Sequence, residues 1–182
     1  MAVRNKRNNG EEYPLKNIQI ADISKAYSVR RLVEDDVDLI LALCRENTLY
    51  AEYCGKAIDR ELIEHDIRVT PPGIPMEQKY YIGFFEGNKL AAVMDLIDGF
   101  PDSGCAFIGF FMMNIALQGR GIGSSIILEV LSCLKGLGFE RCRLGIDKGN
   151  PQSNHFWKKN GFEVIREVAL ESGAVLLAER QL

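Results

Sequence analysis

Residues 27–33 alternate between apolar and polar side chains, which is the pattern of a strand with one buried face. Residues 37–44 and 59–69 instead carry apolar side chains three and four positions apart, so each stretch predicts a helix. Two aspartates precede the first of these helices, and either can cap it. Residues 70–75 include three prolines, which end the second helix and predict a stiff loop, either at the rim of a site or as a spacer.

Three apolar runs in the middle of the chain predict strands. Residues 80–85 and 90–97 are separated by the glycine-containing segment 86–89, which favours an antiparallel hairpin. Residues 105–113 are apolar nearly throughout, which is typical of a central strand covered on both faces. These runs therefore predict three neighbouring strands.

The second half of the chain alternates between the two periodicities. Residues 126–137 carry apolar side chains at helical spacing, and residues 141–146 predict a strand, so that together with the preceding strand they form one βαβ crossover. Residues 151–160 predict a short helix with proline in its first turn. Residues 162–168 and 175–179 predict a closing hairpin.

These elements predict a mixed α and β fold, with a central twisted, mostly antiparallel sheet of about six to seven strands, one parallel βαβ crossover and about four flanking helices. A single domain, residues 27–182, accounts for all of them. We expect residues 1–26 to be a flexible N-terminal extension, because residues 1–16 contain too few apolar side chains to offset chain entropy. The basic residues of this extension suit either a partner or a solvated terminus.

The segment 118–124 connects the central strand to the long helix and reads Gln-Gly-Arg-Gly-Ile-Gly-Ser. The first N–H groups of a helix lack partners within the helix and carry the positive end of its dipole. Glycines allow the main chain to approach a pyrophosphate without interference from Cβ atoms, and Arg120 adds a fixed positive charge. The segment therefore predicts a phosphate-binding turn, with a glycine turn that binds no ligand as the alternative.

Two common nucleotide-binding motifs differ from this turn. A P-loop has a lysine directly after its glycines, and none stands there in this chain, which argues against nucleoside triphosphate hydrolysis. A Rossmann turn requires glycine or alanine near Ser124 and an acidic residue after the next strand, where Asp147 lies close to the required spacing. The turn here follows several strands and two helices instead of opening a βαβ array, which disfavours the Rossmann alternative.

Residues 107–162 resemble the acetyl-coenzyme A core of the GNAT superfamily of N-acetyltransferases. The first motif of that family is [Gln/Arg]-x-x-Gly-x-[Gly/Ala], which residues 118–123 match. The second is Asn-x-x-[Ala/Ser]-x-x-[apolar]-Tyr-x-Lys-x-Gly-Phe, which residues 150–162 match except that Trp157 replaces the tyrosine. Both motifs stand at the expected separation with a predicted strand between them, so the resemblance implies a GNAT-like fold.

The resemblance also implies a function. A GNAT-like N-acetyltransferase transfers an acetyl group from acetyl-coenzyme A to a primary amine of a small molecule or peptide, by direct attack in a ternary complex. Acetyl-coenzyme A is then the co-substrate, and no metal is needed. A coenzyme A-binding sensory or regulatory module with weak or no catalysis is the alternative, because Trp157 stands where the family has its usual general acid.

Carried over position by position, the resemblance implies that the main chain of Phe111 and Met113 holds the acyl and pantetheine part of the cofactor. The backbone amides of residues 118–123 would bind the pyrophosphate, and the backbone N–H of Met113 would stabilise the oxyanion. The cofactor-binding residues implied in this way are Phe111, Met112, Met113, Gln118, Gly119, Arg120, Gly121, Ile122, Gly123, Ser124, Asn150, Ser153, Phe156 and Trp157.

The sequence leaves the groups that transfer protons open. The indole N–H of Trp157 can donate a hydrogen bond but not a useful proton, so its role as an acid is doubtful. Asp147 is a candidate base, as are Asp95 and Asp98, and each has a solvated or structural role as its alternative. Deprotonation of the amine through water is equally compatible with the chemistry.

Charge and cysteine content narrow the expected partners. A formal net charge of −3 gives no basic surplus, so nucleic acid is not expected as a partner. Five cysteines without a C-x-x-C pair argue against a disulfide framework or a metal site and favour a reducing cytoplasm. No apolar run approaches the roughly 20 residues of a membrane span. We therefore expect a cytoplasmic monomer or homodimer that does not bind membranes and whose partner is an amine-bearing small molecule or peptide.

Overall fold

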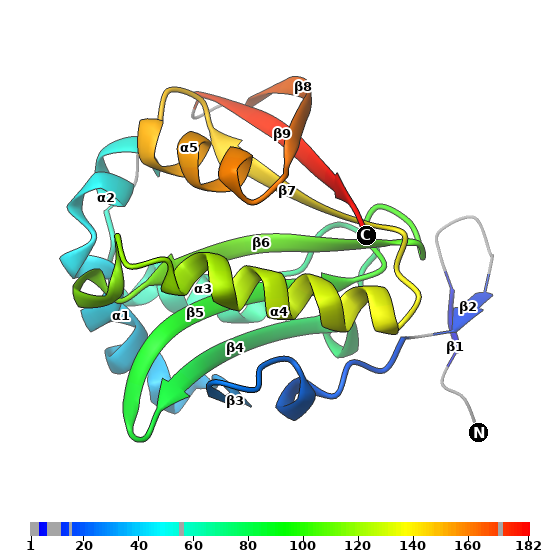
Figure 1. The fold of residues 1–182 in the computed structure, drawn as a ribbon, viewed down its shortest axis with the longest axis horizontal. Helices are drawn as coiled ribbons and strands as arrows, with labels where there is room; N and C mark the ends of the chain where they lie inside the picture. Colours follow the sequence, from blue (N-terminus) through cyan, green and yellow to red (C-terminus); the bar gives the residue numbers. More distant parts are fainter. Residues whose placement is uncertain (1–3, 7–11, 15, 55–56, 171–172) are drawn as a thin grey trace.

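The computed structural model describes residues 4–6, 12–14, 16–54, 57–170 and 173–182 (Figure 1). Seven strands form one sheet in the order β3-β4-β5-β6-β7-β9-β8. Neighbouring strands in it are antiparallel except β6 and β7, which are parallel, so the predicted mixed sheet with one βαβ crossover is confirmed. The strands are β3 (Ser28–Arg31), β4 (Lys79–Glu86), β5 (Lys89–Asp98), β6 (Cys105–Met113), β7 (Arg141–Asp147), β8 (Glu163–Leu170) and β9 (Gly173–Gln181).

Five α-helices accompany this sheet in the described part of the chain, one more than the sequence predicts. The additional helix is α2, which follows α1 after the single residue Asn47. A helix of seven residues is marginal on its own, so its formation depends on tertiary packing that the local pattern does not reveal. The helices are α1 (Val37–Glu46), α2 (Thr48–Cys54), α3 (Arg60–Arg68), α4 (Ile122–Gly136) and α5 (Pro151–Lys159).

The sheet separates two apolar cores. In Figure 1, α4 crosses the near face of the sheet, whereas α1 and α3 lie behind it. Strand β5 supplies both cores because its side chains alternate: Met94 packs in the core under α4, and Val93 packs in the core under α1 and α3. Both residues are fully buried, as expected for a strand that has helices on both of its faces.

The N-terminal boundary of the domain differs from the predicted one at residue 27. Ile18 and Ile23 are 4% and 2% exposed and belong to the core under α4. The backbone N–H of Lys16 also donates to the Asp98 carboxylate at 3.0 Å. Residues 16–26 therefore pack on the domain instead of forming part of a flexible extension, because two isolated apolar side chains suffice to anchor a segment that lacks periodicity. Further upstream, β1 (Arg4–Lys6) pairs with β2 (Glu12–Pro14), and residues 1–3, 7–11 and 15 lie outside the described residues.

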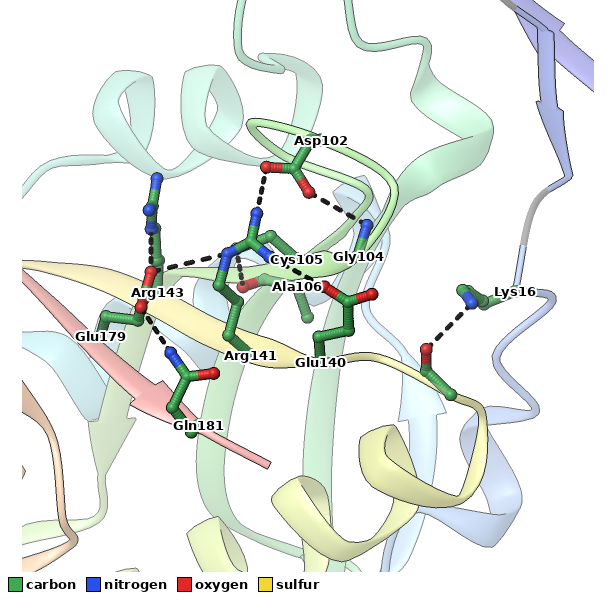
Figure 2. A network of polar contacts seen from close by, with 11 residues as sticks. Lys16, Asp102, Gly104, Cys105, Ala106, Glu140, Arg141, Arg143, Glu179 and Gln181 are labelled. Atoms are coloured by element: carbon green, nitrogen blue, oxygen red, sulfur yellow. Dashed lines mark hydrogen bonds and ion pairs between the residues drawn. The ribbon is translucent and has the colours of Figure 1, made fainter.

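A network of charged side chains fastens the end of the sheet at which β6 and β7 begin (Figure 2). Arg141, the first residue of β7, contacts the Asp102 carboxylate in the loop before β6 and the Glu179 carboxylate of β9. Arg143 donates to the same Glu179 at 2.5 Å. Arg141 and Glu179 are 18% and 14% exposed, so these pairs are more shielded from water than ordinary surface ion pairs. They hold β6, β7 and β9 together at this end, while β6 and β7 separate at the other.

Candidate functional site

Strands β6 and β7 are paired over only part of their length. Their register ends at Ile108↔Leu144, although β6 continues to Met113 and β7 to Asp147. The register between β5 and β6 skips Gly109, so a bulge bends β6 close to this point. The two strands therefore diverge (Figure 1) and leave a cleft of about 910 Å³ between them.

The main chain of β6 faces this cleft at alternate residues. The backbone N–H of Asn114 donates to the Ala91 carbonyl at 2.8 Å, so this is a hydrogen-bonded pair in the antiparallel ladder of β5 and β6. Bonded and non-bonded pairs alternate along such a ladder, so the N–H and C=O groups of Phe111 and Met113 point away from β5. They point toward the gap left by β7, where an extended ligand can bind as an added strand.

The glycine turn before α4 closes one end of the cleft. Gly119 and Gly121 have left-handed φ angles of 71° and 81°, and Gly121 is the N-cap of α4. Gly123 is required for close packing instead, because a Cβ atom there would lie 3.2 Å from the ring of Phe156 and 3.4 Å from Met113 Cγ. The three glycines line the cleft, so the first N–H groups of α4 lie beside the end of β6.

Helix α5 forms the wall of the cleft that continues from β7. Asn150 caps this helix by accepting a hydrogen bond from the backbone N–H of Ser153 at 3.0 Å, and Pro151 begins the helix as predicted. Asn150 and Ser153 both line the cleft. Local residues thus specify where α5 begins. Because β7 runs parallel to β6, this helix begins at the same end of the sheet at which β6 ends.

Trp157 lies in a cluster of aromatic rings. It is 6% exposed, and its ring centroid is 5.0 Å from that of Phe156, 5.2 Å from Phe162 and 6.0 Å from Phe111. Phe111 and Phe156 are stacked on each other, so the cluster joins β6 to α5 at the inner part of the cleft. This packing role explains a bulky apolar ring at position 157 without any proton transfer.

A chain of side-chain amides joins the glycine turn to the helices on both sides of it. Gln118 donates to the Asn47 side chain at 2.6 Å and accepts from Gln152 of α5 at 3.0 Å. Asn47 is 7% exposed and also donates to the main-chain carbonyl of Met113 at 3.2 Å. The position of Asn47 in the sequence did not indicate this role, because an asparagine after a helix suggests only a C-cap and reveals no partner 71 residues away.

Most of the predicted site residues meet in this cleft. All the cofactor-binding candidates line it except Arg120 and Ile122, and Arg120 lies exposed on the turn. Asp147 also lines the cleft, where burial raises the pKa of its carboxyl group. Asp98 does not line it: this side chain is 1% exposed and accepts the hydrogen bond from Lys16, so its role is structural and it is not a candidate base.

Asp95 lies on the opposite side of the cleft from α5. Its carboxylate pairs with the ammonium group of Lys79 at 2.7 Å, and the two side chains are 14% and 2% exposed. Burial raises the pKa of Asp95 to about 6, although the positive charge of Lys79 acts in the opposite direction. Asp95 is therefore ionised at neutral pH and remains able to accept a proton.

Residues 42–162 match the family model described as the acetyltransferase (GNAT) family. The chain belongs to this family. The match includes the glycine turn, the two diverging strands and α5, so the cleft lies inside the part of the chain that defines the GNAT family. No match was found among curated protein sequences.

Solved structures of GNAT proteins share this fold at low sequence identity. An acetyltransferase from Thermus thermophilus is 19% identical with a TM-score of 0.69, covering 86% of this chain and 97% of its own. PaiA N-acetyltransferase from Thermoplasma acidophilum, in complex with coenzyme A, is 18% identical with a TM-score of 0.60, and the match covers 85% of this chain and 98% of that one. A spermidine N-acetyltransferase chimera from Vibrio cholerae and hSSAT is 18% identical with a TM-score of 0.63, and the match covers 86% of this chain and 96% of that one.

None of the helices in the described part of the chain is both long and apolar enough to cross a membrane. The same residues contain no group of three or more histidine, cysteine, aspartate or glutamate side chains arranged to hold a metal ion.

Proposed function

We propose that this GNAT protein transfers the acetyl group of acetyl-coenzyme A to a primary amine of a small molecule or peptide, within a ternary complex. One observation carries the proposal: the main chain of β6 at Phe111 and Met113 and the first turn of α4 border the same cleft. A ligand with an amide-containing arm and a pyrophosphate needs these two features side by side. The shared fold with PaiA N-acetyltransferase in complex with coenzyme A supports the same choice of ligand.

The residues present fit this co-substrate. Gly119 and Gly121 face open space and carry no Cβ atom, so they leave the N–H groups at the start of α4 open to a pyrophosphate, while Gly123 lets the helix pack close to Phe156. Asn150, Ser153 and Phe156 line the cleft. Asn150 and Ser153 would border the pantetheine arm, and Phe156 would border the thioester. Acetyl-coenzyme A, when bound, supplies an acetyl thioester. The backbone N–H of Met113 faces the gap and is suited to donate to the carbonyl oxygen as negative charge develops on it.

The reaction requires three proton transfers. The amine is first deprotonated, its nitrogen attacks the thioester carbonyl carbon, and the carbon–sulfur bond then breaks. The nitrogen loses a second proton as the amide forms, and the departing thiolate takes up a proton to give the free thiol. Of the candidate bases, Asp95 and Asp147 line the cleft, where either can accept the first proton directly or through water. Trp157 offers no proton to the thiolate, so we assign that step to water.

A thiol-release assay tests the proposal. Purified protein is incubated with acetyl-coenzyme A and a panel of primary amines, and free thiol and acetylated amine are quantified in parallel. We expect thiol to appear together with acetylated amine in equal amounts, and only when an acceptor amine is present. Tight binding of acetyl-coenzyme A with no turnover for any amine would contradict the enzyme and favour a coenzyme A-binding module.

We expect Trp157→Phe to reduce kcat by less than about tenfold, whereas loss of a general acid costs about 10²–10⁴-fold. The smaller ring leaves space in the aromatic cluster, so the free energy of unfolding should fall by about 1–3 kcal/mol. Phe162→Leu is the matched control, because it changes the same cluster at a residue that does not line the cleft. Urea unfolding and steady-state kinetics of both variants give the comparison, and a drop in kcat of a hundredfold for Trp157→Phe alone would contradict the packing role.

A further inference from the structure

A row of residues on β4, β5 and β6 forms the side of the cleft opposite α5. Tyr81 of β4 lies directly across from Asp95 of β5, and Asp95 lies across from Phe110 of β6. Asp95 Oδ2 occupies the space beside the bulge, since a Cβ atom built on Gly109 would lie 2.7 Å from it. The carboxylate therefore lies where β6 begins to separate from β7, on the face covered by α1 and α3.

Two buried polar atoms in this row lack a hydrogen-bond partner in the structure. Tyr81 is 3% exposed, and its hydroxyl group is unpartnered. Asp95 Oδ1 is also buried and unpartnered, while Oδ2 accepts from Lys79 at 2.7 Å. Buried polar groups are normally paired, and both residues line the cleft, so the two atoms are suited to bind a polar group of a ligand.

The charge of this part of the cleft indicates the sign of the ligand. Asp66 of α3 lines the cleft on the same side as Asp95, and Asp147 lines it at the end of β7. Among the described residues that line the cleft, the one lysine is Lys159, which belongs to α5. Lys79 partly offsets the charge of Asp95, but Tyr81 and the two aspartates present acceptor oxygens on this side of the cleft, and such a set favours a cation with N–H donors. The remaining surface nearby is mostly apolar and is lined by Tyr50, Leu62, Ile97, Phe107 and Phe110.

We infer that Tyr81, Asp95 and Asp66 form the acceptor subsite and that it takes a primary ammonium group carried on an apolar stem. The inference rests on the proposed acetyl transfer and adds the chemical class of the acceptor. An ammonium group has three N–H donors, so it can donate to Asp95 Oδ1 and to the Tyr81 hydroxyl oxygen at the same time. Asp95 then takes one proton from it, which leaves a neutral amine for the attack and a carboxylic acid that returns the proton to solvent.

The surroundings of Asp95 fit this role as a base. Lys79 and Tyr81 face it from β4 and Asp66 faces it from α3, and burial together with Asp66 raises the pKa of Asp95 against the effect of Lys79. The hydroxyl pKa of Tyr81 is raised by burial, so this side chain stays neutral. The pKa of Asp95 is about 6, and only the ionised carboxylate can act as a base. We therefore expect kcat/KM for the amine to rise as pH increases through about 6 and to be low at more acidic pH, where Asp95 is protonated.

A matched pair of amines tests the subsite. Hexylamine carries an ammonium group on an apolar stem, and 6-aminohexanoate is the same amine with a carboxylate at the far end. We expect wild-type protein to prefer hexylamine in kcat/KM by at least about tenfold, because the acidic wall repels the carboxylate. Tyr81→Phe should raise KM for hexylamine by about tenfold, the effect of one lost hydrogen bond to a charged group. Asp66→Asn removes a negative charge from the same side of the cleft and should also raise KM by about tenfold.

Control variants separate these effects from general damage. Tyr80→Phe removes a hydroxyl from the neighbouring buried tyrosine on the other face of β4, and Asp35→Asn removes an exposed charge away from the cleft. Both should leave KM for hexylamine unchanged. Asp95→Asn is less informative, because it leaves buried Lys79 without its carboxylate and can prevent folding.

Calorimetric titration of hexylamine into protein saturated with coenzyme A measures the affinity of the subsite for the amine in the absence of turnover. Equal binding by Tyr81→Phe, Asp66→Asn and their controls, or equal use of hexylamine and 6-aminohexanoate, would overturn the subsite. Hexylamine binding that depends on Asp66 and Tyr81, but without thiol release for any amine, would instead contradict the proposed acetyl transfer and leave the subsite standing.

Discussion

Replacement of Gly121 by aspartate is expected to weaken coenzyme A binding by about a hundredfold or more, a loss of about 2.7 kcal/mol. Gly121 is the N-cap of α4 and has a φ angle of 81°. An aspartate at an N-cap accepts hydrogen bonds from the first N–H groups of the helix, which are the groups that a pyrophosphate needs. Its negative charge also repels the phosphates, so competition and repulsion act in the same direction. Calorimetric titration with coenzyme A measures the loss.

Gly87→Asp is the matched control for this substitution. Gly87 has a φ angle of 59°, open space around its Cβ position and no contact with the cleft, because it lies in the hairpin between β4 and β5. Both variants experience similar backbone strain, so their thermal unfolding should shift alike, but only Gly121→Asp should lose affinity. Gly121→Ala introduces strain without charge and should keep most of the binding. Wild-type affinity for coenzyme A in Gly121→Asp would refute the assignment of the pyrophosphate to this turn.

Lys79→Met is expected to lower the free energy of unfolding at neutral pH by about 3–5 kcal/mol, because it leaves the buried Asp95 carboxylate without its counter-ion. Lys148→Met offers a close comparison. The Lys148–Glu167 pair has the same 2.7 Å separation as Lys79–Asp95, but its side chains are 53% and 50% exposed. Loss of an exposed pair should cost no more than about 1 kcal/mol. Urea unfolding measures the free energy of unfolding of both variants. Equal losses in the two would contradict burial as the cause of the larger effect in Lys79→Met.

The loss in Lys79→Met should also depend on pH. The pKa of Asp95 in the folded protein is already raised to about 6 by burial, and removal of Lys79 takes away the group that lowers it. A carboxyl group whose folded pKa lies above its unfolded value contributes stability at low pH that is lost as pH rises through the folded pKa. The variant should therefore recover stability relative to wild type as pH falls from 7 to just below about 6, and at lower pH the two proteins should gain stability in parallel. A deficit that grows toward low pH would be inconsistent with an unpaired Asp95 carboxylate.

Local patterns predicted the regular elements that carry their own periodicity. The apolar runs of β4 and β5 arise because both faces of these strands are buried, and the helical spacing in α4 arises because one face of that helix is buried. The same approach missed α2, which is too short to show a period, and the packing of residues 16–26, whose two buried isoleucines form no pattern. Elements whose stability comes from distant contacts leave little trace in their own residues.

Assignment of proton-transfer groups required the tertiary structure. Asp95 and Asp98 are three positions apart on β5 and look alike in the sequence, yet one lines the cleft and the other is tied to Lys16 on the opposite face. Tyr81 gave no signal, because a tyrosine in an apolar strand suits any core. Its unpartnered hydroxyl becomes informative only when its neighbours are known.

By itself, the sequence determined the fold class, the glycine turn at the start of α4 and the family resemblance. These features rest on residues close together in the chain, where glycine spacing, helix caps and periodicity act through local geometry. Only the tertiary structure decided where β6 leaves β7, that Trp157 lies in an aromatic cluster, and that Asp95 lies beside Gly109 within reach of Lys79 and Tyr81. Each of these contacts joins residues on different strands or helices. The packing of side chains between elements determines them, so no local sequence pattern reveals them.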